Sequence, residues 1–163
     1  VVECSEDGAV LEVVNARAKG VKLKPEKGVN LPGADLSIPA LTGHDRDDLA
    51  FVARNADIVG FSFVQTVEDV DALLTALDEL RGEAVQPAVM LKIETPMAMH
   101  NLPDLIVRAG GRRDVAVMIA RGDLAVEIGF ERLSEVQEEI LWLCEAASVP
   151  VVLATQVLDG LLH

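Results

Sequence analysis

Four continuous apolar runs recur along the chain after residue 55, without the polar alternation of a half-exposed strand. They are ADIVGFSF (56–63), AVMLKIE (88–94), DVAVMIAR (114–121) and VPVVLATQ (149–156). Runs of this length and composition are typical of parallel strands that are covered on both faces. The sequence therefore predicts a parallel sheet built from these four segments.

Segments with helical periodicity separate the runs. Each begins with a residue that can cap a helix, and these are Thr42, Thr66, Thr95 and Ser134. The predicted strands start at about 56, 88, 114 and 149, and a strand every 26 to 35 residues is typical of βα units. This spacing leaves two architectures open: a (β/α)₈ barrel, of which four units would be half, and a doubly wound sheet.

The first thirty residues carry a different pattern. Short apolar runs, among them Ala9–Val14 and Val21–Leu23, are separated by polar and glycine-containing segments. This predicts a few short antiparallel strands at the edge of a small β domain. The glycines, asparagine and proline of GVNLPG (28–33) are typical of a junction between domains. We therefore predict that residues 1–30 are the end of a small β domain and that residues 31–163 form an α/β domain.

Composition and charge limit the kinds of molecule that the protein is expected to bind. Lys and Arg total 14 against 27 Asp and Glu, giving a formal net charge of −13, and no basic face with interleaved aromatic residues occurs. Nucleic acid and anionic membrane are therefore excluded as expected partners. The two cysteines, Cys4 and Cys144, lack metal-type spacing, which favours a reduced, cytoplasmic protein. Because no apolar stretch reaches the roughly 18 residues of a membrane span, we expect a soluble chain. The missing initiator methionine suggests a piece of a longer protein.

Polar residues end each of the four apolar runs. They are Ser62, then Lys92 with Glu94, then Arg121 with Asp123, then Thr155. In parallel α/β folds, ligands bind at the carboxyl ends of the strands. Four strands that contribute polar groups to one edge therefore predict a functional site there.

Lys92 and Glu94 lie two positions apart, so in a strand they project to the same side. One interpretation is a buried ion pair, which often stabilises a fold no more than apolar residues of the same size. The other is a carboxylate metal ligand beside a cationic group that stabilises developing negative charge.

The ARGD segment at 120–123 has two interpretations as well. It is either a strand-end turn with a surface charge pair or an anion-binding turn. In the second case Gly122 lets the backbone approach a ligand and Asp123 supplies a second hard oxygen ligand. Two carboxylates without nearby nitrogen or sulfur ligands favour Mg²⁺ or Mn²⁺ over zinc. Thr155 alone is typical of an ordinary strand, and only its expected closeness to Lys92 and Asp123 favours a role in a site.

Six segments of the sequence resemble the pyruvate kinase family, in the family's order and spacing. They are KGVNLPG (27–33), IPALTGHDRDDLAF (38–51), GFSFV (60–64), LKIET (91–95), MIARGDLAVEI (118–128) and ATQVLDG (154–160). The resemblance implies a partial (β/α)₈ barrel of the TIM type in residues 31–163. It implies that residues 1–30 are the end of the small β domain, which acts as a lid.

The resemblance also implies an activity. The full-length protein would be a glycolytic phosphotransferase that moves phosphoryl from phosphoenolpyruvate to ADP, giving pyruvate and ATP. It would be a cytoplasmic homo-oligomer that uses Mg²⁺ or Mn²⁺, and K⁺ held by residues absent from this chain. Because the early strands and the last strand of the barrel are not in these residues, we expect the chain to be inactive alone.

Residue roles follow from the same resemblance. It implies catalytic roles for Lys92 and Thr155, metal ligation by Glu94 and Asp123, and a contact of Lys27 with nucleotide phosphates. The substrate-binding residues would be Lys92, Arg121, Gly122, Asp123, Thr155 and Ser62.

The sequence departs from the family pattern at three places, none of which removes a predicted metal ligand, and two other functions stay open. Ala125 replaces a usual glycine, Gln65 replaces a common basic residue, and GFERL (129–133) replaces a proline-containing turn. One alternative is a metal-dependent lyase or mutase acting on phosphoenolpyruvate or pyruvate. The other is a non-catalytic sensing or assembly module of pyruvate kinase type.

Overall fold

The chain divides into two compact units, Val1–Leu31 and Pro32–His163. The structure is a computed structural model, and it describes residues 2–6, 8–16, 18–22, 24–25, 31, 38–80, 86–155, 157 and 161.

The first unit contains one β-hairpin. Strands β1 (Glu3–Ser5) and β2 (Gly8–Val10) pair antiparallel, with Cys4 opposite Ala9. Every described residue of this unit is exposed. The prediction of short antiparallel strands is confirmed for this hairpin, but it is wrong for the described residues of 11–14 and 21–23, which form no strand. An exposed apolar run without a partner strand gains neither ladder hydrogen bonds nor burial.

The second unit alternates helices and strands. In chain order they are α1 (Gly43–Asn55), β3 (Ile58–Phe61), α2 (Val67–Glu79), β4 (Ala88–Ile93), α3 (Pro96–His100), α4 (Leu102–Gly110), β5 (Val115–Ala120), α5 (Arg121–Ile128), α6 (Leu133–Ala146) and β6 (Val151–Ala154). Each of the four predicted strands is present, two to four residues shorter than its apolar run except β4, which lacks only the last residue.

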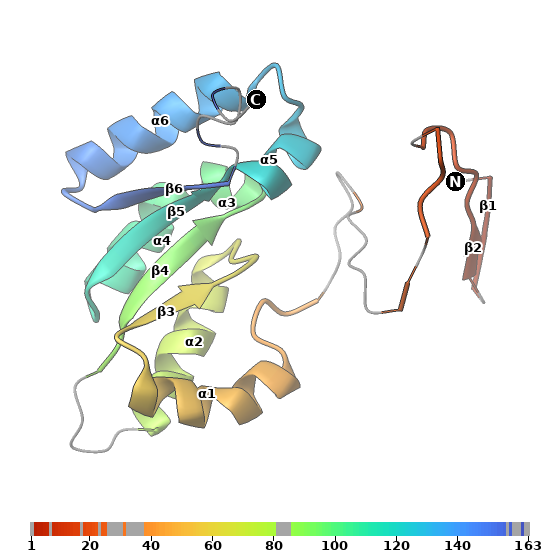
Figure 1. The fold of residues 1–163 in the computed structure, drawn as a ribbon. Helices are drawn as coiled ribbons and strands as arrows, with labels where there is room; N and C mark the ends of the chain where they lie inside the picture. Colours follow the sequence, from red (N-terminus) through yellow and green to blue (C-terminus); the bar gives the residue numbers. More distant parts are fainter. Residues whose placement is uncertain are drawn as a thin grey trace. The chain divides into compact units, whose positions relative to one another are not determined.

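The four strands form one parallel sheet in the order β3-β4-β5-β6. In a doubly wound sheet the order of the strands reverses at a switch point. In a (β/α)₈ barrel each strand lies next to the one that precedes it in the chain. The consecutive order therefore selects the barrel, of which this unit forms a part. In Figure 1 helices α2 and α4 run behind the sheet, and the strands point towards α3 and α5.

The two faces of the sheet differ sharply in burial. Buried side chains from the strands, among them Leu91, Ile93 and Ile119, pack with the apolar stripes of α2, α4 and α6. The opposite face carries Ile58, which is 51% exposed, and the half-buried Met90. Alternation along β4 places Lys92 on that same open face. The core thus lies between sheet and helices, and the open face is the interior side of the barrel.

The predicted helix starts are confirmed at three of four positions. Thr42 and Thr66 form complete capping boxes, and the Thr95 hydroxyl accepts a hydrogen bond from the Ala98 N–H at 3.2 Å. The capping box predicted at Ser134 is wrong: α6 begins at the buried Leu133 and has no side-chain cap. A hydrogen-bonded turn over residues 129–133 leads directly into α6, so Ser134 is already helical.

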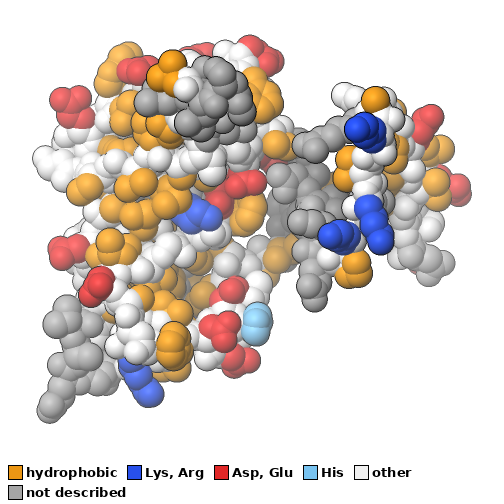
Figure 2. Space-filling view, in the orientation of Figure 1, with side chains coloured by type: hydrophobic (Ala, Val, Ile, Leu, Met, Phe, Trp, Pro, Cys, Tyr) orange, Lys and Arg blue, Asp and Glu red, His pale blue; other side chains and the backbone are white. Residues whose placement is uncertain are grey.

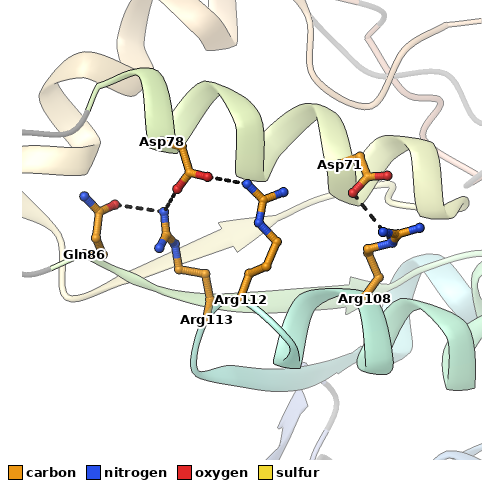
Figure 3. A network of polar contacts seen from close by, with 6 residues as sticks. All are labelled: Asp71, Asp78, Gln86, Arg108, Arg112 and Arg113. Atoms are coloured by element: carbon orange, nitrogen blue, oxygen red, sulfur yellow. Dashed lines mark hydrogen bonds and ion pairs between the residues drawn. The ribbon is translucent and has the colours of Figure 1, made fainter.

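An ion cluster joins α2 to the segment after α4, and we call it the outer clamp. Arg112 and Arg113 each bind one carboxylate oxygen of Asp78, and Arg113 also donates to the Gln86 side chain at 3.0 Å (Figure 3). Partial desolvation raises the pKa of Asp78, but the hydrogen bonds from the two arginines outweigh it and hold that pKa below its ordinary value. The clamp lies at the amino ends of β4 and β5, opposite the carboxyl ends.

In the described part of the chain no helix combines the length and the apolar composition needed to cross a bilayer.

Candidate functional site

Apart from Lys27, the predicted site residues lie at the carboxyl ends of the four parallel strands. Ser62 follows β3, Glu94 follows β4, Arg121 follows β5 and Thr155 follows β6. Adjacent strands are in register, with Phe61 beside Leu91 and Ile93 beside Ile119, so these ends meet along one edge. Figure 2 shows an acidic and a basic side chain next to each other on this open face, among hydrophobic side chains.

The centre of the site is a contact between Lys92, Glu94 and Ser62. The Lys92 Nζ lies 2.8 Å from Glu94 Oε1 and donates to Ser62 Oγ at 2.6 Å. The Glu94 side chain is 1% exposed, whereas that of Lys92 is 26% exposed. An ammonium has three donors, and in the described part of the chain only two of them are used here. The remaining donor of Lys92 is therefore available to a ligand on the open face.

Phe63 contributes a contact that the sequence did not indicate. Its backbone N–H donates to Glu94 Oε2 at 2.6 Å. The residue has a φ of 53°, in the left-handed region that residues other than glycine rarely adopt. Phenylalanine has no preference for this conformation, so no sequence signal marks it.

The loop between β3 and α2 is held at several points. Phe61 and Val64 are buried on either side of Phe63. The Gln65 N–H donates to Asp69 Oδ2 at 3.0 Å, and the Gln65 carbonyl accepts from Asn101 Nδ2 at 2.9 Å. The Gln65 side chain, a departure from the family pattern, accepts a hydrogen bond from the Thr95 hydroxyl at 3.1 Å. Side chains from α2 and from the residues that precede α3 and α4 therefore fix the loop that carries Ser62.

The second part of the site joins α5 to the end of β6. The Gly122 N–H donates to Thr155 Oγ1 at 3.2 Å, and Thr155 has a φ of 61°. A Cβ added to Gly122 would lie 3.4 Å from Thr155 Oγ1, which is ordinary van der Waals contact. The protein itself therefore has room for a methyl group at position 122, in contact with Thr155.

The remaining predicted residues differ in how the structure places them. Asp123 is half-buried in the first turn of α5. Arg121, the first residue of that helix, has a buried Nε that lacks a hydrogen-bond partner among the described residues. Lys27 lies outside the described residues.

The donor set fits a hard divalent cation better than zinc. Glu94 uses one lone pair of each oxygen, for Lys92 and for the Phe63 N–H, and a carboxylate offers about four. Among the described residues no three His, Cys, Asp or Glu side chains are grouped as a metal cage. Mg²⁺ is usually held by one or two carboxylates together with water and substrate oxygens, so Glu94 and Asp123 are the candidate ligands.

Comparison with known proteins agrees with this geometry. The family model of the pyruvate kinase barrel domain matches residues 1–163. The chain is 38% identical over 162 residues to the pyruvate kinase of Agrobacterium vitis, covering 99% of this chain and 30% of that protein. It is 36% identical over 160 residues to the pyruvate kinase of Thermotoga maritima, covering 94% of this chain and 33% of that protein. It is also 36% identical over 159 residues to pyruvate kinase 2 of Candida glabrata, covering 93% of this chain and 30% of that protein.

The chain thus spans about a third of the length of the curated relatives that it matches. Because the match extends over the whole chain and includes the four strand ends, the chain belongs to the pyruvate kinase family.

Proposed function

We propose that, within the intact protein, this chain forms the metal and substrate half of an enzyme that transfers phosphoryl from phosphoenolpyruvate to ADP. The observation that carries the proposal is the Lys92 ammonium, held between Ser62 Oγ and Glu94 at the carboxyl edge of the sheet. In such an enzyme residues 1–30 would belong to the lid and residues 31–163 to the barrel.

Lys92 fits the role of an electrostatic catalyst. Phosphoryl transfer depends on positioning and on stabilisation of charge more than on covalent steps by the protein. Its two fixed contacts prevent the ammonium from reorienting, so its free donor can point at the oxygen where negative charge develops. Ser62 acts by positioning that ammonium.

Glu94 and Asp123 are proposed to hold Mg²⁺ or Mn²⁺. A bound divalent cation supplies positive charge that polarises phosphoryl and enolate oxygens. Burial of Glu94 at 1% exposure and its two hydrogen-bond donors keep the carboxylate in one orientation. The chain thereby provides a preformed oxygen ligand directly after β4.

Thr155 and Gly122 are proposed to contact the substrate carboxylate and the carbon that gains a proton. The Gly122 N–H occupies a lone pair of Thr155 Oγ1, which leaves the hydroxyl proton free to be donated to a ligand. The buried, unpartnered Nε of Arg121 gives this end of α5 a further cationic group. Lys27 is proposed to contact the nucleotide phosphates.

Further properties are proposed from family membership. They are the use of K⁺, assembly as a homo-oligomer and a cytoplasmic location. The two free cysteines, one exposed and one buried, agree with a reducing compartment.

The test is an assay of the full gene product for pyruvate formation from phosphoenolpyruvate, ADP and Mg²⁺. The wild type is expected to turn over, and Glu94→Gln is expected to reduce kcat at least roughly 10²-fold. Glu135→Gln is the matched control, because Glu135 lies on α6 with a side chain 66% exposed. It should leave kcat unchanged.

The other outcomes identify the alternatives. Phosphoenolpyruvate binding without any turnover by the wild type would favour the sensing module. Pyruvate chemistry that does not require ADP would favour the lyase or mutase.

A further inference from the structure

Three described residues other than glycine have a left-handed backbone, namely Phe63, Ser148 and Thr155. Two of the three lie in the candidate site. Strained backbone persists only where surrounding contacts enforce it, and it gathers at functional sites. Thr155 has a role in the proposed function, whereas Phe63 has none.

The side chain of Phe63 does not account for its backbone conformation. The ring is 49% exposed, while its neighbours Phe61 and Val64 are 4% and 0% exposed. Those neighbours anchor the loop in the core. The left-handed turn at Phe63 therefore does not serve to bury the ring.

The turn instead directs two groups at the charged pair on β4. The Phe63 N–H meets Glu94 Oε2 at 2.6 Å, and the preceding Ser62 Oγ receives the Lys92 ammonium at 2.6 Å. Glu94 Oε1 is occupied by Lys92 at 2.8 Å, so each carboxylate oxygen has one donor. Because Phe61 and Val64 are both anchored in the core, an extended backbone at residue 63 would shift the peptide that carries this N–H and leave a buried carboxylate oxygen without it.

We propose that Phe63 is a positioning residue, whose left-handed backbone holds the Glu94 carboxylate in the orientation that binds the divalent cation. The inference rests on the proposed function. It assigns the requirement at position 63 to backbone conformation and not to the aromatic ring. Groups that orient a metal ligand typically change metal affinity 10-fold to 100-fold when they are lost.

The experiment measures Mn²⁺ affinity of the full gene product by the paramagnetic resonance signal of free Mn²⁺, without substrate. Phe63→Gly keeps the left-handed backbone and removes the ring, and it should hold the Kd within about twofold. Phe63→Val keeps an apolar side chain but is β-branched and resists positive φ, and it should raise the Kd about tenfold. Thermal unfolding of each variant checks that it is folded.

Phe130 provides the matched control. It is 66% exposed and does not have a positive φ. Phe130→Gly and Phe130→Val should both leave the Mn²⁺ Kd unchanged. If Phe63→Val does not fold, Phe63→Asn and Phe63→Thr provide the same contrast, because Asn tolerates the left-handed region and the smaller, β-branched Thr resists it.

The outcomes separate the inference from the proposed function. If the wild type binds Mn²⁺ and Phe63→Gly weakens binding as much as Phe63→Val, the ring is required. The inference is then overturned, while the proposed function stands. If the wild type binds no Mn²⁺ at any concentration tested, the proposed function fails and the inference fails with it. Retained affinity in Phe63→Gly with weakened affinity in Phe63→Val supports both.

Discussion

Two clusters of charge lie at opposite ends of the same sheet and differ in the burial of their carboxylates, because the Asp78 side chain is 32% exposed and the Glu94 side chain 1% exposed. At the amino ends, Arg112 and Arg113 take both carboxylate oxygens of Asp78. At the carboxyl ends, Lys92 and Glu94 contact each other but keep a donor and lone pairs for a ligand. A partly exposed carboxylate held by two arginines thus joins elements of the fold, whereas a buried carboxylate beside an ammonium that faces the open surface marks a site. In (β/α)₈ barrels these ends carry stability and catalysis respectively.

The largest expected effect follows from removing the site ammonium. Lys92→Met should lower kcat for pyruvate formation by roughly 10³-fold, because the charge that stabilises the transition state is lost. It should also lower the free energy of unfolding by about 3 to 5 kcal/mol, because Glu94 remains buried without its cation.

The double variant Lys92→Met/Glu94→Leu separates these effects. Unfolding free energy should return towards the wild-type value, since apolar side chains replace the buried pair, while kcat stays low. Steady-state kinetics and urea unfolding measure both quantities. A double variant that remains as unstable as Lys92→Met would mean that the pair serves the fold.

A smaller effect is expected from filling the space beside Thr155. Gly122→Ala adds a methyl group that the protein itself accommodates, in the first turn of a helix. Unfolding free energy should rise by up to about 1 kcal/mol, because alanine is the better helix former. The KM for phosphoenolpyruvate should rise about tenfold if the substrate occupies that space. An unchanged KM would contradict the proposed contact of Gly122 with substrate.

A substitution in the outer clamp should change stability and leave kcat unchanged. Asp78→Asn should lower the urea midpoint at pH 7 and leave kcat unchanged, because it removes the carboxylate that both arginines bind. The folded pKa of Asp78 is depressed, so its contribution to stability is complete above the ordinary aspartate pKa and is lost as pH falls through the folded pKa. The difference in midpoint between wild type and variant should therefore shrink below about pH 4.

The smallest expected effect is on the rate at which the Cys144 thiol reacts, and this rate reports the stability of the fold. Burial raises the pKa of the Cys144 thiol to about 11, so at pH 8 only about one thiol in a thousand is ionised. An aromatic disulfide reagent should modify the exposed Cys4 promptly and Cys144 only on unfolding. Asp78→Asn should accelerate labelling of Cys144, and Gly122→Ala should not. Equal acceleration by both would remove the distinction between the two ends of the sheet.

Much of the fold was predictable because its signals are local. A strand buried on both faces needs a continuous apolar run, and a helix needs a stripe and a cap, so all four strands were identified. The start of α6 was predicted wrongly at Ser134, because the turn that precedes the helix replaced the cap. The boundary after residue 30 stays a prediction.

The site was predictable only in part. Spacing alone indicated that Lys92 and Glu94 share a side of β4, and their 2.8 Å contact confirms it. Their roles, and those of Asp123 and Thr155, stay predictions. The Phe63 contact was not predicted because phenylalanine has no preference for a left-handed backbone. The conformation depends on the burial of Phe61 and Val64 on either side, which the sequence alone does not indicate.

The consecutive order of the strands bears on how the chain folds during synthesis. Ile58 pairs with Ala88 and Val89 with Val115, so each strand finds its neighbour within about thirty residues of its own synthesis. Short separations of this kind favour rapid pairing, and they let each βα unit dock as it leaves the ribosome. The contacts of Lys92 with Ser62 and Glu94 need only residues up to 94, and the outer clamp needs Arg113. The Gly122 contact needs Thr155, so the second part of the site can form only after both.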